Sequence, residues 1–267
     1  MRIIYLLFLP ILIPAAWADQ VESMSELALL PAYCRGTQQI RSISKDTTPI
    51  EQYMAIYGAA YYHFHHYCWA LNAENNADKI SDDYLRQSKL GSSLSDYQYF
   101  LDHAPPTFTL LPEVYTSRAR VLFKLKRDDE AVKDLNTAIR LKPDYSVAYA
   151  RLGDYYQRIG DKDDAIKILE RGISYTRNPT NAAYFIAKLE KLGKPFQGVP
   201  GSAVQNEKDV ANDYGKAPEK NGTASTQASQ SDSASAVIPS ENMSGPPGQT
   251  IPADQAAQPK PYCRFCP

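Results

Sequence analysis

The sequence feature that most constrains the fold of this chain is an internal repeat with a period of 34 residues. Residues 112–145 align without gaps with residues 146–179, and side chains of similar size recur at matching positions. The matching pairs are Tyr115 and Tyr149, Ala119 and Gly153, Leu122 and Tyr156, Ala131 and Ala165, Leu135 and Leu169, and Ala138 and Gly172. Small residues let two helices approach closely, and large residues fill the space between them. Each copy therefore predicts two packed helices, joined by a polar turn at residues 126–129 or 160–163.

The period and the helix-turn-helix composition resemble the tetratricopeptide repeat family. The second copy carries the fuller motif, with Leu152-Gly153 in its first helix. The first copy has Arg118-Ala119 where the family often has Leu-Gly, but it supplies Pro143 at the closing position. The resemblance implies an all-α fold in which antiparallel helix-turn-helix repeats stack into a short solenoid.

Two repeats bury their apolar faces only if further helices cover both ends. At the C-terminal end, the entry signal Asn178-Pro179 and the stop signal at Gly193 predict a capping helix over residues 180–192. At the N-terminal end, GSSLSDYQYFLDHAPPTF resembles the second helix of a degenerate third repeat, whose partner helix carries no recognisable motif. We therefore expect an N-terminal helical module over residues 19–110, followed by two repeats and the capping helix over residues 111–195.

The two ends of the sequence differ from this helical part. Residues 1–18 hold an apolar run and end in Ala16-Trp17-Ala18, the layout of a cleavable signal peptide, with an uncleaved N-terminal anchor as the alternative. No later segment is apolar for long enough to cross a bilayer, so we expect no transmembrane span after cleavage. Residues 196–267 are dominated by Ser, Ala, Gln, Pro and Gly, which predicts a disordered tail.

The compartment that follows from this layout is the periplasm or the exterior of the cell. The stretches LPAYC, HHYCWALN and APPTFTLLPEVY together also resemble an N-terminal module of exported bacterial tetratricopeptide proteins. The formal net charge at pH 7 is −1 and no long basic run is present, so nucleic acid is not an expected partner.

No catalytic motif stands out in the chain. It contains no Gly-rich phosphate loop, no His-Glu-x-x-His pair and no nucleophile elbow. We expect neither an enzymatic activity nor a cofactor, and the remaining class of function is the binding of a protein or peptide partner. The identity of that partner and the oligomeric state are not predicted.

The family resemblance also implies where a partner would bind, because the first helix of each repeat lines a concave groove in these proteins. The implied residues are Thr116, Arg120, Phe123 and Lys124 in the first repeat and Ala150, Arg151, Asp154 and Arg158 in the second. Four of these are basic and would suit carboxylates or an acidic peptide terminus. The alternative is an ordinary solvated helix face. The full pattern of the family's carboxylate-gripping clamp is not matched, so that activity is not implied.

The stretch YYHFHHYC holds three of the chain's four histidines. Apolar residues recur at helical spacing over residues 53–71, which predicts one long helix with a single apolar stripe. On such a helix His63 and His66 face one side and His65 another, so the three do not converge on one metal ion. We expect these histidines to pack against their neighbours, and no metal site is predicted.

The four cysteines fall into two pairs. In an exported protein Cys34 and Cys68 predict a disulfide, with separate buried thiols as the alternative. Cys263 and Cys266 form a terminal Cys-x-x-Cys pair, for which a local disulfide is expected. This pair is no haem-attachment motif, because Pro267 stands where a histidine is required.

Together these observations predict an exported, periplasmic scaffold or adaptor that holds a protein or peptide partner in its repeat groove. The alternative is a metal-binding or thiol-redox accessory protein. That second function would use the helix with His63, His65 and His66, or the tail with Cys263 and Cys266.

Overall fold

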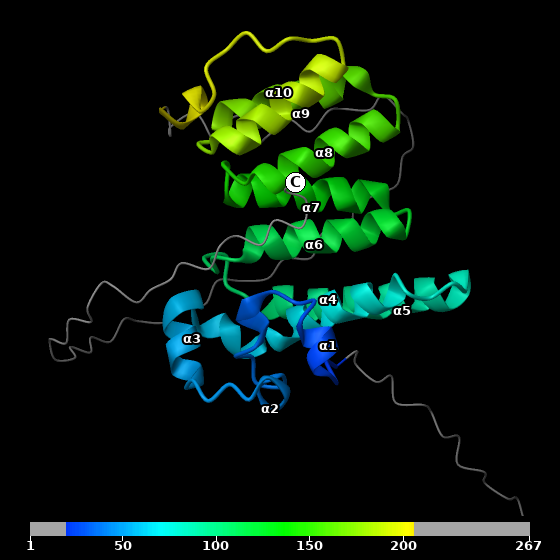
Figure 1. Ribbon diagram of the computed structural model, residues 1–267, viewed down its shortest axis with the longest axis vertical. Helices are drawn as coiled ribbons and strands as arrows, with labels where there is room; N and C mark the ends of the chain where they lie inside the picture. The colour runs from blue at the N-terminus through cyan, green and yellow to red at the C-terminus, as the bar shows by residue number, and fades with distance from the viewer. Residues whose placement is uncertain (1–19, 206–267) are drawn as a thin grey trace, which may run out of the picture. The chain divides into compact units, whose positions relative to one another are not determined.

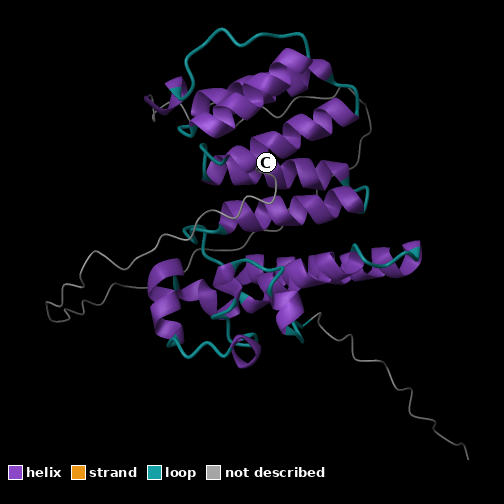
Figure 2. Ribbon diagram, viewed as in Figure 1, coloured by secondary structure: helices purple, strands orange, loops and turns teal. Residues whose placement is uncertain are grey.

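The computed structural model describes residues 20–205, and this part of the chain consists of helices and their connections (Figures 1 and 2). The predictions for residues 1–18, and for the tail from residue 206 with Cys263 and Cys266, lie outside the described residues. The α-helices are α1 (Met24–Leu27), α2 (Arg41–Ser44), α3 (Ile50–Tyr57), α4 (His65–Ala77), α5 (Asp83–His103), α6 (Leu111–Lys124), α7 (Asp128–Leu141), α8 (Ser146–Arg158), α9 (Lys162–Tyr175) and α10 (Pro179–Lys191). The short 3-10 helices are η1 (Ala32–Cys34), η2 (Ala59–His63) and η3 (Ser202–Gln205).

The two sequence repeats are two helical hairpins, in which α6 packs against α7 and α8 against α9. Figure 1 shows these helices following one another in layers from α6 to α10. The repeated small residues are buried, and a Cβ atom added at Gly153 would lie 2.9 Å from Cδ2 of Leu169. Left-handed residues close the turns, Lys126 with φ of 61° and Gly160 with φ of 80°. The predicted all-α repeat fold is confirmed.

The capping helix forms close to its predicted bounds. The side chain of Asn178 accepts hydrogen bonds from the backbone N–H groups of Thr180 and Asn181, at 2.9 and 3.2 Å, which satisfies the start of α10. Phe185 and Leu189 on this helix are buried in the core of the repeats. The helix thereby covers the face of α9 that a further repeat would cover.

The packed chain continues past the predicted boundary at residue 195. Phe196 packs against the core of the repeats, and the backbone N–H of Gly201 donates to the carbonyl oxygen of Ile173 at 2.9 Å. Residues 196–205 were predicted to belong to the tail. In the structure this short segment packs against α9.

The degenerate N-terminal unit is a third hairpin made of α4 and α5, and α5 packs against α6. The prediction of one long helix over residues 53–71 is wrong. The chain breaks at Gly58, whose φ of 99° is unfavourable for residues with a side chain, and passes through η2 before α4 begins. The apolar spacing in the sequence therefore runs through two separate helices, α3 and α4, and the 3-10 helix η2 between them.

Cys34 and Cys68 join the segment before α3 to α4. Their sulfur atoms lie 2.08 Å apart in a disulfide, and both residues are fully buried. The neighbouring tyrosines reach across to the first repeat, where the hydroxyls of Tyr33 and Tyr67 donate to Oε1 of Glu113 on α6. Burial raises the pKa of the Glu113 carboxyl. The N-terminal module and the first repeat therefore share polar contacts as well as apolar packing.

Among residues 20–205, none of the helices combines the length and the apolar character that crossing a bilayer requires.

Candidate ligand-binding groove

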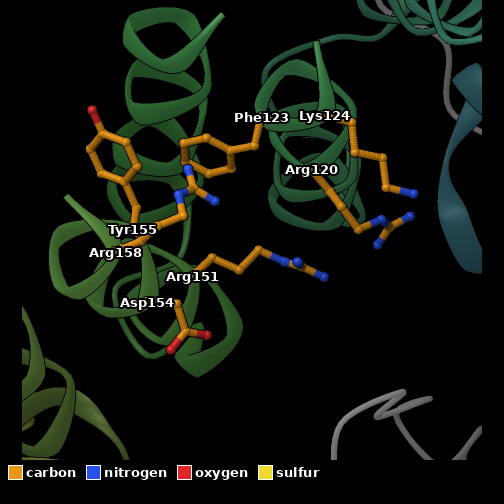
Figure 3. A pocket seen from close by; sticks show the side chains of 7 residues that line it. All are labelled: Arg120, Phe123, Lys124, Arg151, Asp154, Tyr155 and Arg158. Atoms are coloured by element: carbon orange, nitrogen blue, oxygen red, sulfur yellow. The ribbon is translucent and has the colours of Figure 1, made fainter. Parts of the chain in front are cut away.

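The first helices of the two repeats, α6 and α8, enclose a pocket of about 290 Å3. Its lining consists of Arg120, Phe123 and Lys124 from α6 and Arg151, Asp154, Tyr155 and Arg158 from α8 (Figure 3). Counted from Arg120 on α6 and from Arg151 on α8, the other lining residues follow after three, four or seven positions, so they lie on one face of each helix. The pocket is the geometric result of aligning the same face of two repeated helices.

Six of the residues predicted for the groove line this pocket, and two do not. Thr116 lies one helical turn before Arg120 and is only 3% exposed, so packing covers it. Ala150 is half-buried and packs against the core of the repeats. Tyr155 was not predicted, because the aligned residue of the first repeat, Val121, is a fully buried core residue. That the lining residues bind a partner stays a prediction.

The cations of the first repeat have acidic partners on α4 and at its C-cap. Arg120 donates through Nε to Oε1 of Glu74 at 2.5 Å and through Nη2 to Oε2 of the same carboxylate. Lys124 Nζ lies 2.8 Å from Oε1 of Glu74 and 2.6 Å from Oδ1 of Asp78. These contacts correct the predicted basic lining, because much of the positive charge of Arg120 and Lys124 is balanced within the chain.

The protonation of this pair follows from its contacts. Burial alone would raise the pKa of Glu74, but the hydrogen bonds and charges of Arg120 and Lys124 outweigh it and lower the pKa. Burial likewise opposes the charge of Arg120, and the carboxylate of Glu74 overcomes this and raises the pKa of the guanidinium. Both groups are therefore charged at neutral pH.

The second repeat contributes a more exposed cation. The side chain of Arg158 is 57% exposed, and its guanidinium carbon lies 5.1 Å from the ring centroid of Phe123 and 5.4 Å from that of Tyr155. The two rings stack with centroids 5.1 Å apart. Figure 3 shows the guanidinium beside the ring of Phe123. A planar cation on aromatic faces is held in place while its outer N–H groups face solvent.

Two further charges complete the pocket. Asp154 forms an ion pair with Lys188 of α10, so its negative charge is balanced from the capping helix. Arg151 lies beside Arg120, and burial together with the charge of Arg120 lowers the pKa of Arg151 to about 10. The guanidinium still carries its charge at neutral pH, and the pocket is positive on its second-repeat side.

The histidines are distributed as packing residues around Tyr99 and Trp69. His63 and His66 both contact the ring of Tyr99. His65 and His66 both contact Trp69, each with ring centroids 4.8 Å apart. Nδ1 of His66 lies 2.7 Å from Oδ1 of Asp96. Burial, followed by the proximity of His66, lowers the pKa of His65 to about 4. Within residues 20–205, no three His, Cys, Asp or Glu side chains are grouped to hold a metal ion.

Comparison with known protein families identifies the repeats. A family model described as "TPR repeat" matches residues 119–160, and a second, "Tetratricopeptide repeat", matches residues 146–179. The matched segments run from within α6 to the first residue of α10 and contain the whole lining of the pocket. No solved structure matches the chain with comparable significance.

Several curated proteins are similar to part of the chain. The DnaJ homolog subfamily C member 7 homolog of Dictyostelium discoideum is 22% identical over 55% of this chain and 25% of its own length. The Hsp70-Hsp90 organizing protein of Triticum aestivum is 24% identical over 46% of this chain and 22% of its own length. The RNA polymerase II-associated protein 3 of Xenopus laevis is 36% identical over 33% of this chain and 14% of its own length. The chain thus spans a quarter or less of these relatives.

Proposed function

Because this chain is a tetratricopeptide repeat protein, with repeats matched over residues 119–179, we propose that it is a protein-interaction scaffold. Its partner segment binds in the pocket between α6 and α8. The name of one relative, the Hsp70-Hsp90 organizing protein, describes a protein that organises other proteins, which supports this class of function. No catalytic role is proposed.

The observation that carries the proposal is the exposed guanidinium of Arg158 on the stacked rings of Phe123 and Tyr155. This arrangement offers N–H donors for a carboxylate and, beside them, apolar surface for a neighbouring side chain of a bound peptide. The position of the pocket on the repeated helices links the site to the part of the chain whose family is known.

Replacing Arg158 with Glu is expected to reduce recovery of the partner about tenfold or more, because a charge-assisted hydrogen bond is replaced by repulsion. The measurement is affinity capture from the native envelope fraction, with quantification of each co-purified protein. Arg158 is 57% exposed and its ion-pair distance to Asp128 is 3.9 Å, so helicity should be unchanged and thermal stability should fall only slightly.

The matched control is Arg140→Glu, which makes the same charge change at an exposed position on α7, outside the pocket. A partner that binds in the pocket is recovered with Arg140→Glu and lost with Arg158→Glu. Equal recovery with both variants would show that the partner binds elsewhere.

We further propose that the protein is exported to the periplasm or secreted. The support is the signal-peptide pattern of residues 1–18 and the pairing of Cys34 with Cys68, since disulfides persist in oxidising compartments. The mature chain is expected to begin at Asp19 and to contain peptides joined through Cys34 and Cys68.

Mass spectrometry of the protein purified from its native envelope, before and after reduction, measures both features. The control is the same chain expressed in a reducing cytosol without residues 1–18, in which the cysteines stay as thiols. Retention of residues 1–18 together with free thiols at both positions would contradict export.

A further inference from the structure

The N-terminal module supplies an acidic group to a groove that otherwise belongs to the repeats. Glu74 lies on α4, outside both matched repeats, and is 1% exposed. Both of its carboxylate oxygens are occupied, Oε1 by Nε of Arg120 and Nζ of Lys124, and Oε2 by Nη2 of Arg120. An incoming carboxylate would have to displace a buried one, which leaves a charge without its partner and is costly.

Asp78 extends the same effect to the surface. It is the C-cap residue that follows α4, four positions after Glu74. Its carboxylate contacts Nζ of Lys124 at 2.6 and 2.8 Å, and its side chain is half exposed. The first-repeat side of the groove therefore already contains acidic groups in the positions that two carboxylates of a ligand would take.

The second-repeat side has a different character. Arg158 is exposed and its nearest acid, Asp128, lies 3.9 Å from Nη2, beyond hydrogen-bond distance. Asp154 is paired with Lys188 and so repels an approaching anion less than a free carboxylate would. The half-buried ring of Phe123 adds apolar surface directly beside the cation, and the ring of Tyr155, which is 7% exposed, supports it from below. One carboxylate next to an apolar or aromatic side chain fits this side of the groove.

We propose that Glu74, assisted by Asp78, acts as an internal anion that sets the specificity of the groove. The groove binds partner segments that bring one carboxylate beside an apolar or aromatic residue, and it gains nothing from a second carboxylate. This inference rests on the proposed function, since it concerns the same site. Glu74 is a positioning residue here, because it acts on the ligand through Arg120 and Lys124.

The test uses synthetic fluorescent peptides and the full mature chain, with affinity measured by fluorescence anisotropy at physiological salt. One peptide contains a single Glu-Phe pair, and the others add a second Glu one to four residues away. The wild-type protein is expected to bind all of them within about twofold. In Glu74→Gln, Arg120 loses its internal anion, and at least one doubly acidic peptide should bind about fivefold to tenfold tighter than the single-Glu peptide.

The matched control is Glu190→Gln, which removes one negative charge at an exposed position on α10 and should leave the peptide preference unchanged. Asp78→Asn provides a second variant at a half-exposed site, for which a smaller gain is expected and folding is not at risk. Circular dichroism melting establishes that each variant is folded. If Glu74→Gln does not fold, Asp78→Asn decides the question.

The outcomes separate this inference from the proposed function. A wild-type protein that already prefers a doubly acidic peptide about tenfold, or variants without any gain, would overturn the role of Glu74 while leaving binding in the pocket intact. If no peptide binds the wild-type protein, or if binding is insensitive to Arg158→Glu, the pocket is not the site and both proposals fail.

Discussion

Replacing Arg120 with Ala is expected to lower the free energy of unfolding by about 3–5 kcal/mol, because it leaves the buried carboxylate of Glu74 without its main partner. Both bonds of the bidentate pair are lost, and the remaining contact to Lys124 reaches only Oε1. The side chain of Glu74 is 2% exposed, so water cannot replace the missing donors. Urea unfolding followed by circular dichroism measures the change.

The control for this prediction is Arg140→Ala, which removes a guanidinium from an exposed position on α7 and should change stability by about 0.5 kcal/mol or less.

Loss of the Glu74 pair should also change the pH dependence of the free energy of unfolding. The lowered pKa of Glu74 stabilises the folded state at neutral pH, and this contribution disappears as the pH falls through the folded-state pKa. The difference between wild type and Arg120→Ala should therefore shrink in acid. A loss below about 1 kcal/mol at neutral pH would mean that the pair contributes little to the fold.

Replacing Phe185 with Ala is expected to have a similarly large effect, about 3–5 kcal/mol, because it opens a cavity where α10 closes the repeats. Phe185 is 1% exposed, and a Cβ atom added at Gly172 of α9 would lie 3.1 Å from its Cε2 atom. The ring is therefore in close contact with the preceding helix. Thermal unfolding by differential scanning calorimetry measures the loss.

The adjacent Tyr184 provides the control, since it lies on the same helix and is 41% exposed. Tyr184→Ala removes an aromatic ring of nearly the same size without emptying the core, so its effect should be far smaller. Equal losses in the two variants would indicate that α10 is not a cap with one buried face.

The repeats could be predicted from the sequence because their packing residues recur at a fixed spacing. Ala131 and Ala165 are both fully buried in the first turn of the second helix of their hairpins, as aligned positions in equivalent helices should be. The helix break at Gly58 was not predicted, because the apolar spacing continues from α3 into α4. The glycine itself was the one signal in the sequence that favoured a break. Apolar spacing alone did not show where the helix ends, nor that Ile56 in the first part of the stripe is 68% exposed.

The sequence predicted most of the residues that line the pocket, but it did not predict the acidic groups that balance their charge. Arg120 and Lys124 are on the expected face, yet the acids that balance them lie 46 residues earlier in the sequence, on a helix without a repeat motif. Nothing in the local sequence of α4 distinguishes Glu74 from a solvated acid. Pairings of this kind depend on how two unlike hairpins pack, which only the structure reveals.

The contacts of Glu113 have a consequence for the order in which the chain can assemble. The hydroxyl of Tyr33 reaches this carboxylate across 80 residues of sequence, and that of Tyr67 across 46. Each repeat, by contrast, forms its core between neighbouring helices. Because contacts between distant residues require closure of long loops, the repeats can form early, whereas the N-terminal module must wait for α6. The N-terminal module, which is synthesised before the repeats, is thus expected to complete its packing after them.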